Sequence, residues 1–98
     1  MDRVTGFDWD AGNREKCQKH GVSIAEIEHA MLGPMAVEFD PAHSIIEPRQ
    51  RAVGRTAAGR HLFIVFTVRQ RTEGVLIRPI SARYMHAKEV RHYEEIKD

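Results

Sequence analysis

The segment from His61 to Arg69, HLFIVFTVR, constrains the fold more than any other part of the chain. Its side chains are apolar on both faces and rich in β-branched and aromatic residues, which favour strands. A strand of this kind must be covered on both faces, which is typical of the middle of a sheet. We therefore expect residues 61–69 to form a central β-strand.

Three further segments have the pattern of strands in that sheet. Residues 35–40 alternate apolar and polar side chains, and a loop over residues 41–46 leads to a strand over residues 47–55. Residues 75–83 form the last strand. Short turns separate the later segments, so we expect an antiparallel sheet. Pro79 cannot donate to a strand ladder, which predicts an edge position or a bulge at that residue.

Helices are expected before and after the strands in the sequence. Asp10 is placed to cap a helix over about residues 11–20. Ser23 opens a second helix with the capping-box pattern S-x-x-E, and Gly33 with the proline after it ends that helix. A final helix is expected over about residues 85–96.

The predicted architecture is therefore α+β, with two N-terminal helices, an antiparallel sheet of about four strands, and a C-terminal helix. Residues 7–9 are expected to form a short strand or an anchoring segment before the first helix. A length of 98 residues fits one domain spanning residues 1–98.

The cellular compartment is predicted from cysteine content and hydropathy. The chain has one cysteine, Cys17, so it can form no intrachain disulfide and has no C-x-x-C motif. The first residues lack the apolar stretch of a signal peptide. No apolar run approaches the roughly 20 residues of a membrane span. We expect a cytoplasmic protein that does not associate with a membrane.

Charge is distributed unevenly along the chain. Residues 1–48 carry four Lys or Arg and nine Asp or Glu, whereas residues 49–83 carry eight arginines and one acid, Glu73. Arginine has a planar set of donors that can form two parallel hydrogen bonds to a phosphate. Lysine binds a phosphate only as a point charge. The asymmetry predicts either an anionic partner for the middle of the chain or a solvated sheet surface whose arginines serve stability.

Alternation along a strand places residues i, i+2 and i+4 on one face. Three sets of polar residues share a face in this way: Glu47, Arg49 and Arg51; Thr67 and Arg69; and Ser81 and Arg83. If the three faces coincide, they form a shallow pocket for a phosphodiester.

Cleavage of RNA through the ribose 2′-hydroxyl needs a base, fixed positive charge, and an acid for the leaving 5′-oxygen. Glu47 is a candidate base, and the candidate stabilisers are Arg49, Arg69 and Arg83. His20 is a candidate acid, because histidine titrates near pH ~6.5. Two other interpretations stay open. Glu47 can belong to a surface ion pair with a nearby arginine, and His20 can be a helix-end residue favoured by the helix dipole.

The chain has six histidines, which raises the question of a metal site. No two of them form an H-x-x-x-H pair, and the single cysteine adds no cluster. We expect no metal and no cofactor.

Short motifs along about residues 7–95 resemble one bacterial family, the BrnT toxins of type II toxin–antitoxin systems. The motifs are FDWD, KHGVS, E-x-R, AVGR, T-x-R, IRPISAR and E-x-x-x-Y. Each is short, but their order and spacing together are specific. The positions that match residues kept in the family are Lys19, His20, Glu47, Arg49, Arg69, Arg78 and Arg83.

The resemblance implies a RelE-like fold, metal-independent RNA cleavage that blocks translation and arrests growth, and neutralisation by a BrnA-like antitoxin. DNA would be contacted only through that antitoxin. The residues expected to bind substrate are Lys19, Arg51, Thr67, Arg78 and Ser81. Met85 and Tyr93 are either anchors for the antitoxin or ordinary packing residues. Two alternative functions are a catalytically silent module that binds nucleic acid or antitoxin, and an interaction domain with no nucleic-acid role.

Overall fold

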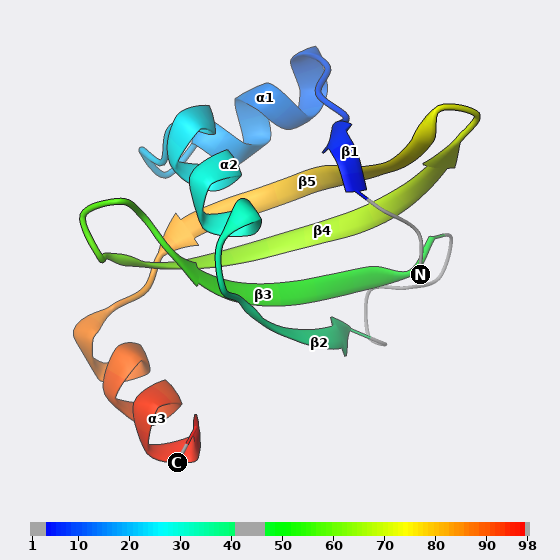
Figure 1. Ribbon diagram of the computed structural model, residues 1–98. Helices are drawn as coiled ribbons and strands as arrows, with labels where there is room; N and C mark the ends of the chain where they lie inside the picture. Colours follow the sequence, from blue (N-terminus) through cyan, green and yellow to red (C-terminus); the bar gives the residue numbers. More distant parts are fainter. Residues whose placement is uncertain (1–3, 41–46, 98) are drawn as a thin grey trace.

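The computed structural model describes residues 4–40 and 47–97 (Figure 1). The described residues form three helices and five strands, in the order β1 (Val4–Phe7), α1 (Ala11–Gln18), α2 (Ile24–Leu32), β2 (Ala36–Asp40), β3 (Arg49–Arg55), β4 (His61–Arg71), β5 (Gly74–Tyr84) and α3 (Ala87–Lys97). The loop expected over residues 41–46 lies outside the described residues.

The strands form one mixed sheet in the order β1-β5-β4-β3-β2. β4 lies in the middle, which confirms the prediction of a central strand. The strands from β2 to β5 are antiparallel neighbours, but β1 runs parallel to β5, with Val4 opposite Val75 and Phe7 opposite Ile77. The prediction of a sheet of about four strands, all antiparallel, is therefore wrong.

The short strand or anchoring segment expected over residues 7–9 is a strand at Val4–Phe7, and its place as a fifth, parallel strand was not predicted because little in its local sequence marks it. β1 is four residues long, its first two residues are exposed, and Gly6 lies within it. Its partner strand is distant in sequence, since the hydroxyl of Thr5 donates to the carbonyl oxygen of Val75 at 3.3 Å across 70 residues. Strand formation that depends on such a neighbour leaves no pattern in a short window of sequence.

The core lies between the sheet and the first two helices. α1 and α2 cover one face of the sheet, and α3 lies on the other side (Figure 1). Alternate residues of β4, Leu62, Ile64 and Phe66, are buried under α1 and α2, where they pack with Cys17 and Ile27. Burial of each large apolar side chain contributes about 1.5–3 kcal/mol, so this layer is the main source of stability.

β5 carries a bulge beside Pro79. Val65 of β4 lies opposite Ser81, but the next residue, Phe66, lies opposite Pro79, so Ile80 is left without a partner. A residue that cannot donate to the ladder is tolerated at such a point. Of the two predicted explanations for the proline, an edge or a bulge, the structure shows the bulge.

The side chain of Asn13, which is 5% exposed, fastens this bulge to the start of α1. Its Nδ2 donates to the carbonyl oxygens of Pro79 at 2.8 Å and Asp8 at 2.9 Å. Its Oδ1 accepts from the backbone N–H of Asp10 at 2.7 Å, which completes the capping box of α1. The segment between β1 and α1 is thereby held against the middle of β5.

We predict that Asn13→Ala lowers the free energy of unfolding by about 1–3 kcal/mol, because buried polar groups lose their partners. The measurement is urea denaturation followed by circular dichroism. Gln18→Ala is the matched control, since Gln18 makes an exposed bond to Arg14 within the same helix. Its effect should stay within about 0.5 kcal/mol. Equal effects of the two substitutions would contradict the prediction.

Candidate functional site

Seven arginines of the sheet lie on the face opposite α1 and α2. Paired residues on neighbouring strands point to the same side, and the register pairs Arg51 with Val65, Val65 with Ser81, Thr67 with Arg78, and Phe63 with Arg83. The arginines that share this side are Arg49, Arg51, Arg55, Arg69, Arg71, Arg78 and Arg83. We refer to this side of the sheet as the arginine face.

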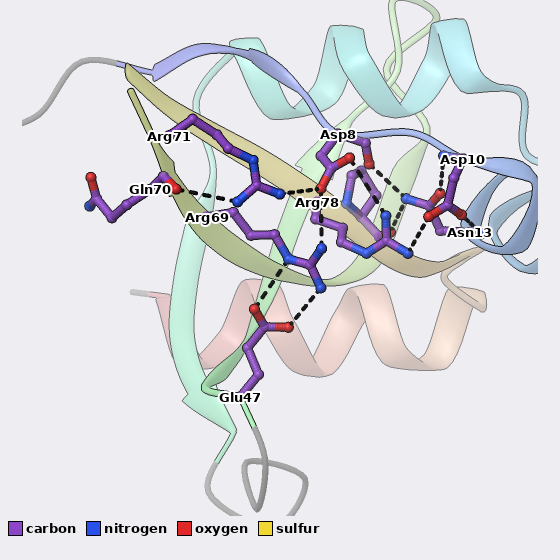
Figure 2. A network of polar contacts seen from close by, with 9 residues as sticks. Asp8, Asp10, Asn13, Glu47, Arg69, Gln70, Arg71 and Arg78 are labelled. Carbon is purple, nitrogen blue, oxygen red and sulfur yellow. Dashed lines mark hydrogen bonds and ion pairs between the residues drawn. The ribbon is translucent and has the colours of Figure 1, made fainter. Parts of the chain in front are cut away.

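Arg69 lies between two carboxylates at one end of the arginine face (Figure 2). It donates from Nε to Glu47 Oε2 at 3.2 Å and from Nη2 to Glu47 Oε1 at 3.3 Å. Its Nη1 lies 3.4 Å from Asp8 Oδ2. The hydrogen bonds that Arg69 donates to Glu47, followed by the negative charges of Glu47 and Asp8, raise the pKa of Arg69. Arg69 thus remains a fixed cation beside a carboxylate.

Two more arginines join this cluster through aspartates. Asp8 Oδ2 lies 3.5 Å from Arg71 Nη2, and Asp8 Oδ1 lies 3.7 Å from Arg78 Nη1. Arg78 Nη2 pairs with Asp10 Oδ2 at 2.9 Å. The N–H of Asn13, and then Arg78, lower the pKa of Asp10. We refer to the six charged residues as the Asp8 network: Asp8, Asp10, Glu47, Arg69, Arg71 and Arg78.

Backbone contacts hold the acids of the Asp8 network in place. The N–H of Asp8 donates to the carbonyl oxygen of Ile77 at 2.8 Å, which continues the ladder between β1 and β5. The hydroxyl of Thr67 donates to the carbonyl oxygen of Pro48 at 2.6 Å, next to Glu47. Thr67 is only 1% exposed, so its side chain positions the segment that carries Glu47 and is not open to a substrate.

Arg83 lies at the other end of the arginine face. It donates to Glu89 of α3 through Nη1 at 2.8 Å and Nη2 at 2.9 Å, and its guanidinium lies 4.8 Å from the centre of the Phe63 ring. Phe63 is six residues from Arg69 along β4, which is about 20 Å at the rise of a strand. The structure therefore does not bring Arg69 and Arg83 to one phosphate.

The remaining candidate residues are spread over both faces. Arg51 forms an ion pair with Glu38 of β2, and Ser81 is half-buried near the middle of the arginine face. Arg49 begins β3. Lys19 and His20 follow α1 on the helix-covered side, where the neighbouring Gly21 carbonyl oxygen accepts from the Tyr84 hydroxyl at 3.5 Å. These contacts place His20 near the end of β5 and outside the Asp8 network.

Asp8 and Asp10 are the members of the site that sequence reasoning missed. Asp10 was interpreted only as a helix cap, and Asp8 only as part of the FDWD motif. The one available signal was the acidic excess of the first half of the chain beside the arginine block. Which acid meets which arginine depends on the pairing of β1 with β5, which sequence alternation does not reveal.

Two negative findings apply to the described residues. Within the described residues, 4–40 and 47–97, no group of three or more His, Cys, Asp or Glu side chains is arranged to hold a metal ion. No helix in that part of the chain combines the length and hydropathy required to cross a membrane.

The fold and the arginine face define a class: a small α+β domain whose sheet carries seven arginines on the face opposite α1 and α2. The family model described as "Ribonuclease toxin, BrnT, of type II toxin-antitoxin system" matches residues 9–89. The chain therefore belongs to the BrnT family of ribonuclease toxins, which confirms the resemblance drawn from its motifs. Membership in a type II system implies an antitoxin protein as partner. A search of curated proteins finds no match.

The pairing of Glu89 with Arg83 leads to a pH prediction. The hydrogen bonds from Arg83, and then the N–H of His86, lower the pKa of Glu89 to about 2. A lowered pKa stabilises the fold above the ordinary pKa of glutamate, about 4.3, and this contribution is lost as the pH falls toward 2. Glu89→Gln should therefore be less stable than the wild type at pH 6, and the difference should shrink by pH 2.5.

Thermal unfolding of both proteins across this pH range provides the measurement. Glu95→Gln is the control, because Glu95 is an exposed acid of the same helix. A stability gap between wild type and Glu89→Gln that stays constant from pH 6 to pH 2.5 would count against the pairing.

Proposed function

We propose that this toxin cleaves RNA by attack of a ribose 2′-hydroxyl on the adjacent phosphate, without a metal ion, and so blocks translation and arrests growth. The observation that supports this most directly is the position of Arg69 between Glu47 and Asp8. A carboxylate base beside a fixed cation is what this reaction needs, because a proton must leave and charge must be stabilised.

The steps assign a role to each of these groups. Glu47 accepts the proton of the 2′-hydroxyl, whose oxygen attacks phosphorus and expels the 5′-oxygen of the next nucleotide, leaving a 2′,3′-cyclic phosphate. Arg69 stabilises the charge on the phosphoryl oxygens. Three of its five N–H groups contact Glu47 and Asp8, so two are open to phosphate. The leaving oxygen takes a proton from solvent, which reaches this half-exposed site.

The rest of the arginine face is proposed to bind RNA on either side of the cleaved bond. Arg71 belongs to the Asp8 network and would contact a phosphate next to the reacting one. Arg78, whose side chain is 17% exposed, would hold the acids of the network and not the RNA strand. Arg83 and Arg51 lie too far along the sheet to contact that phosphate and would bind a more distant part of the strand. Because Arg83 lies far from the cleaved bond, its substitution should weaken RNA binding more than it lowers the cleavage rate. Arg83 would also have to release Glu89 before it could bind RNA.

A BrnA-like antitoxin is the proposed partner, and it would be the only route to DNA. A groove of about 410 Å³ between α3 and the sheet offers it a docking surface that adjoins the arginine face. Phe63, Met85, Tyr93 and Ile96 line the groove, and Ile96 is 70% exposed. An apolar helix or strand would fill the groove, and acidic residues beside it would form ion pairs with the arginines.

The role of Arg69 is tested on labelled RNA with purified protein, free of antitoxin and in the presence of a chelator. Arg69→Ala should cut about 10²–10³-fold more slowly than the wild type, the cost of one lost electrostatic stabiliser. Arg69→Lys should also be slow, because lysine keeps the charge but not the fork. Arg91→Ala, an exposed arginine of α3, should cut like the wild type.

Two results would count against this reading of the site. RNA that stays intact with micromolar wild-type protein would exclude cleavage, and salt-dependent RNA binding in the same sample would then favour a catalytically silent binding module. An Arg69→Ala variant that cuts at the wild-type rate would move the reaction away from this end of the sheet.

The role of Glu47 as base is tested separately by Glu47→Gln, which keeps the shape of the side chain. Loss of a general base should lower single-turnover cleavage by about 10²–10⁴-fold. Binding of RNA should be as tight or tighter, because a negative charge is removed. Weaker binding with an unchanged single-turnover rate would show that Glu47 only positions Arg69.

A further inference from the structure

Asp8 occupies a position that a substrate phosphate would share. Its carboxylate lies 3.4 Å from Arg69, 3.5 Å from Arg71 and 3.7 Å from Arg78. Charged hydrogen bonds of this type are ordinarily about 2.7–2.9 Å long. One carboxylate is therefore shared among three guanidiniums and makes only long, weak contacts with each of them (Figure 2).

The charges of the Asp8 network cancel. Three guanidiniums face three carboxylates, those of Asp8, Asp10 and Glu47. A phosphate that enters adds negative charge to a site that is already balanced. At least one carboxylate must then loosen its contacts, and the one with the longest contacts gives them up at least cost.

Arg78 supplies a place for that carboxylate to go. Among the described residues, Nη1 of Arg78 is buried and makes no hydrogen bond, and its nearest acid is Asp8 Oδ1 at 3.7 Å. A buried donor without a partner costs free energy, and a small movement of Asp8 toward Nη1 would supply the missing partner. The backbone of Asp8 stays fixed, because its N–H and carbonyl oxygen are bonded to Ile77 and Asn13.

We propose that Asp8 is a positioning residue: it holds Arg69 and Arg71 ready in the free toxin, releases them to the RNA phosphate, and moves onto Arg78 when RNA binds. This inference rests on the proposed function, and it adds a residue that never touches the reacting atoms. The inference predicts opposite effects on RNA affinity and on kcat, because Asp8 opposes phosphate binding but supports turnover. Loss of a purely structural ion pair would lower both.

The experiment compares wild type with Asp8→Asn, which has the same shape without the charge. Binding is measured with a fully 2′-O-methylated RNA oligonucleotide, which cannot be cleaved, and turnover with the unmodified oligonucleotide. Asp8→Asn should bind about fivefold more tightly, the effect of removing one charge about 4 Å from a phosphate. Its kcat should fall about 10²-fold, because the complex then lacks the Asp8 carboxylate on Arg78 and the guanidiniums beside the phosphate are less well held.

Glu15→Gln is the control for loss of one charge, since Glu15 is exposed on α1, which covers the other face. It should change binding less than twofold and leave kcat unchanged. Asp8→Asn that binds no tighter than the wild type, or that keeps the wild-type kcat, would overturn the inference. If the wild type binds RNA without cutting it, the proposed function fails while the binding comparison still tests Asp8.

A measurement on the wild type covers the case in which Asp8→Asn does not fold. In protein with ¹⁵N-labelled arginine, the side-chain N–H signals of Arg69, Arg71 and Arg78 are followed as the methylated RNA is added. Movement of Asp8 predicts that the signal of Arg78, whose Nη1 is buried, shifts together with the other two. Shifts of Arg69 and Arg71 with an unchanged Arg78 would overturn the inference.

Discussion

The side-chain amide of Asn13 joins the segment that carries Asp8 and Asp10 to the bulge of β5. It is buried, and its three hydrogen bonds run to backbone groups. In such surroundings an unpaired polar group costs more than a formed bond gains, so the arrangement is held as a unit. The distance from Asp8 to the arginines of β4 and β5 therefore depends on a residue that contacts none of them.

The bulge that Asn13 secures also decides which arginines share a face. Arg78 and Arg83 are five positions apart, and strict alternation along β5 would put them on opposite sides of the sheet. The unpaired Ile80 reverses the alternation between them, and both lie on the arginine face. An irregularity at Pro79 could be predicted from the sequence, because proline removes a donor. Its consequence for Arg78 could not, because that requires the register with β4.

Local chemistry explains most of what the sequence predicted well. The doubly apolar run of β4 and the caps at Asp10 and Ser23 act within a few residues, and the structure has them where they were expected. Distant pairings explain the rest. β1 pairs with β5 across some 70 residues. His20 follows the C-terminal end of α1, whereas Asp8 and Asp10 precede its N-terminal end. Arg69 and Arg83 point to one side as alternation suggests, but alternation does not limit their separation along the strands.

The arginine block seen in the sequence is balanced in space by acids that lie outside the block. Asp8 and Glu47 meet Arg69, Glu38 meets Arg51, Glu89 meets Arg83, and Glu94 meets Arg55. A polyanion that binds this face must compete with these carboxylates at each contact, so its affinity is a difference between two sets of ion pairs. On the proposed function, such a surface would bind a strand that engages several arginines at once better than a single phosphate. An antitoxin with acidic residues can use the same guanidiniums, so RNA and antitoxin would compete for one face of one sheet.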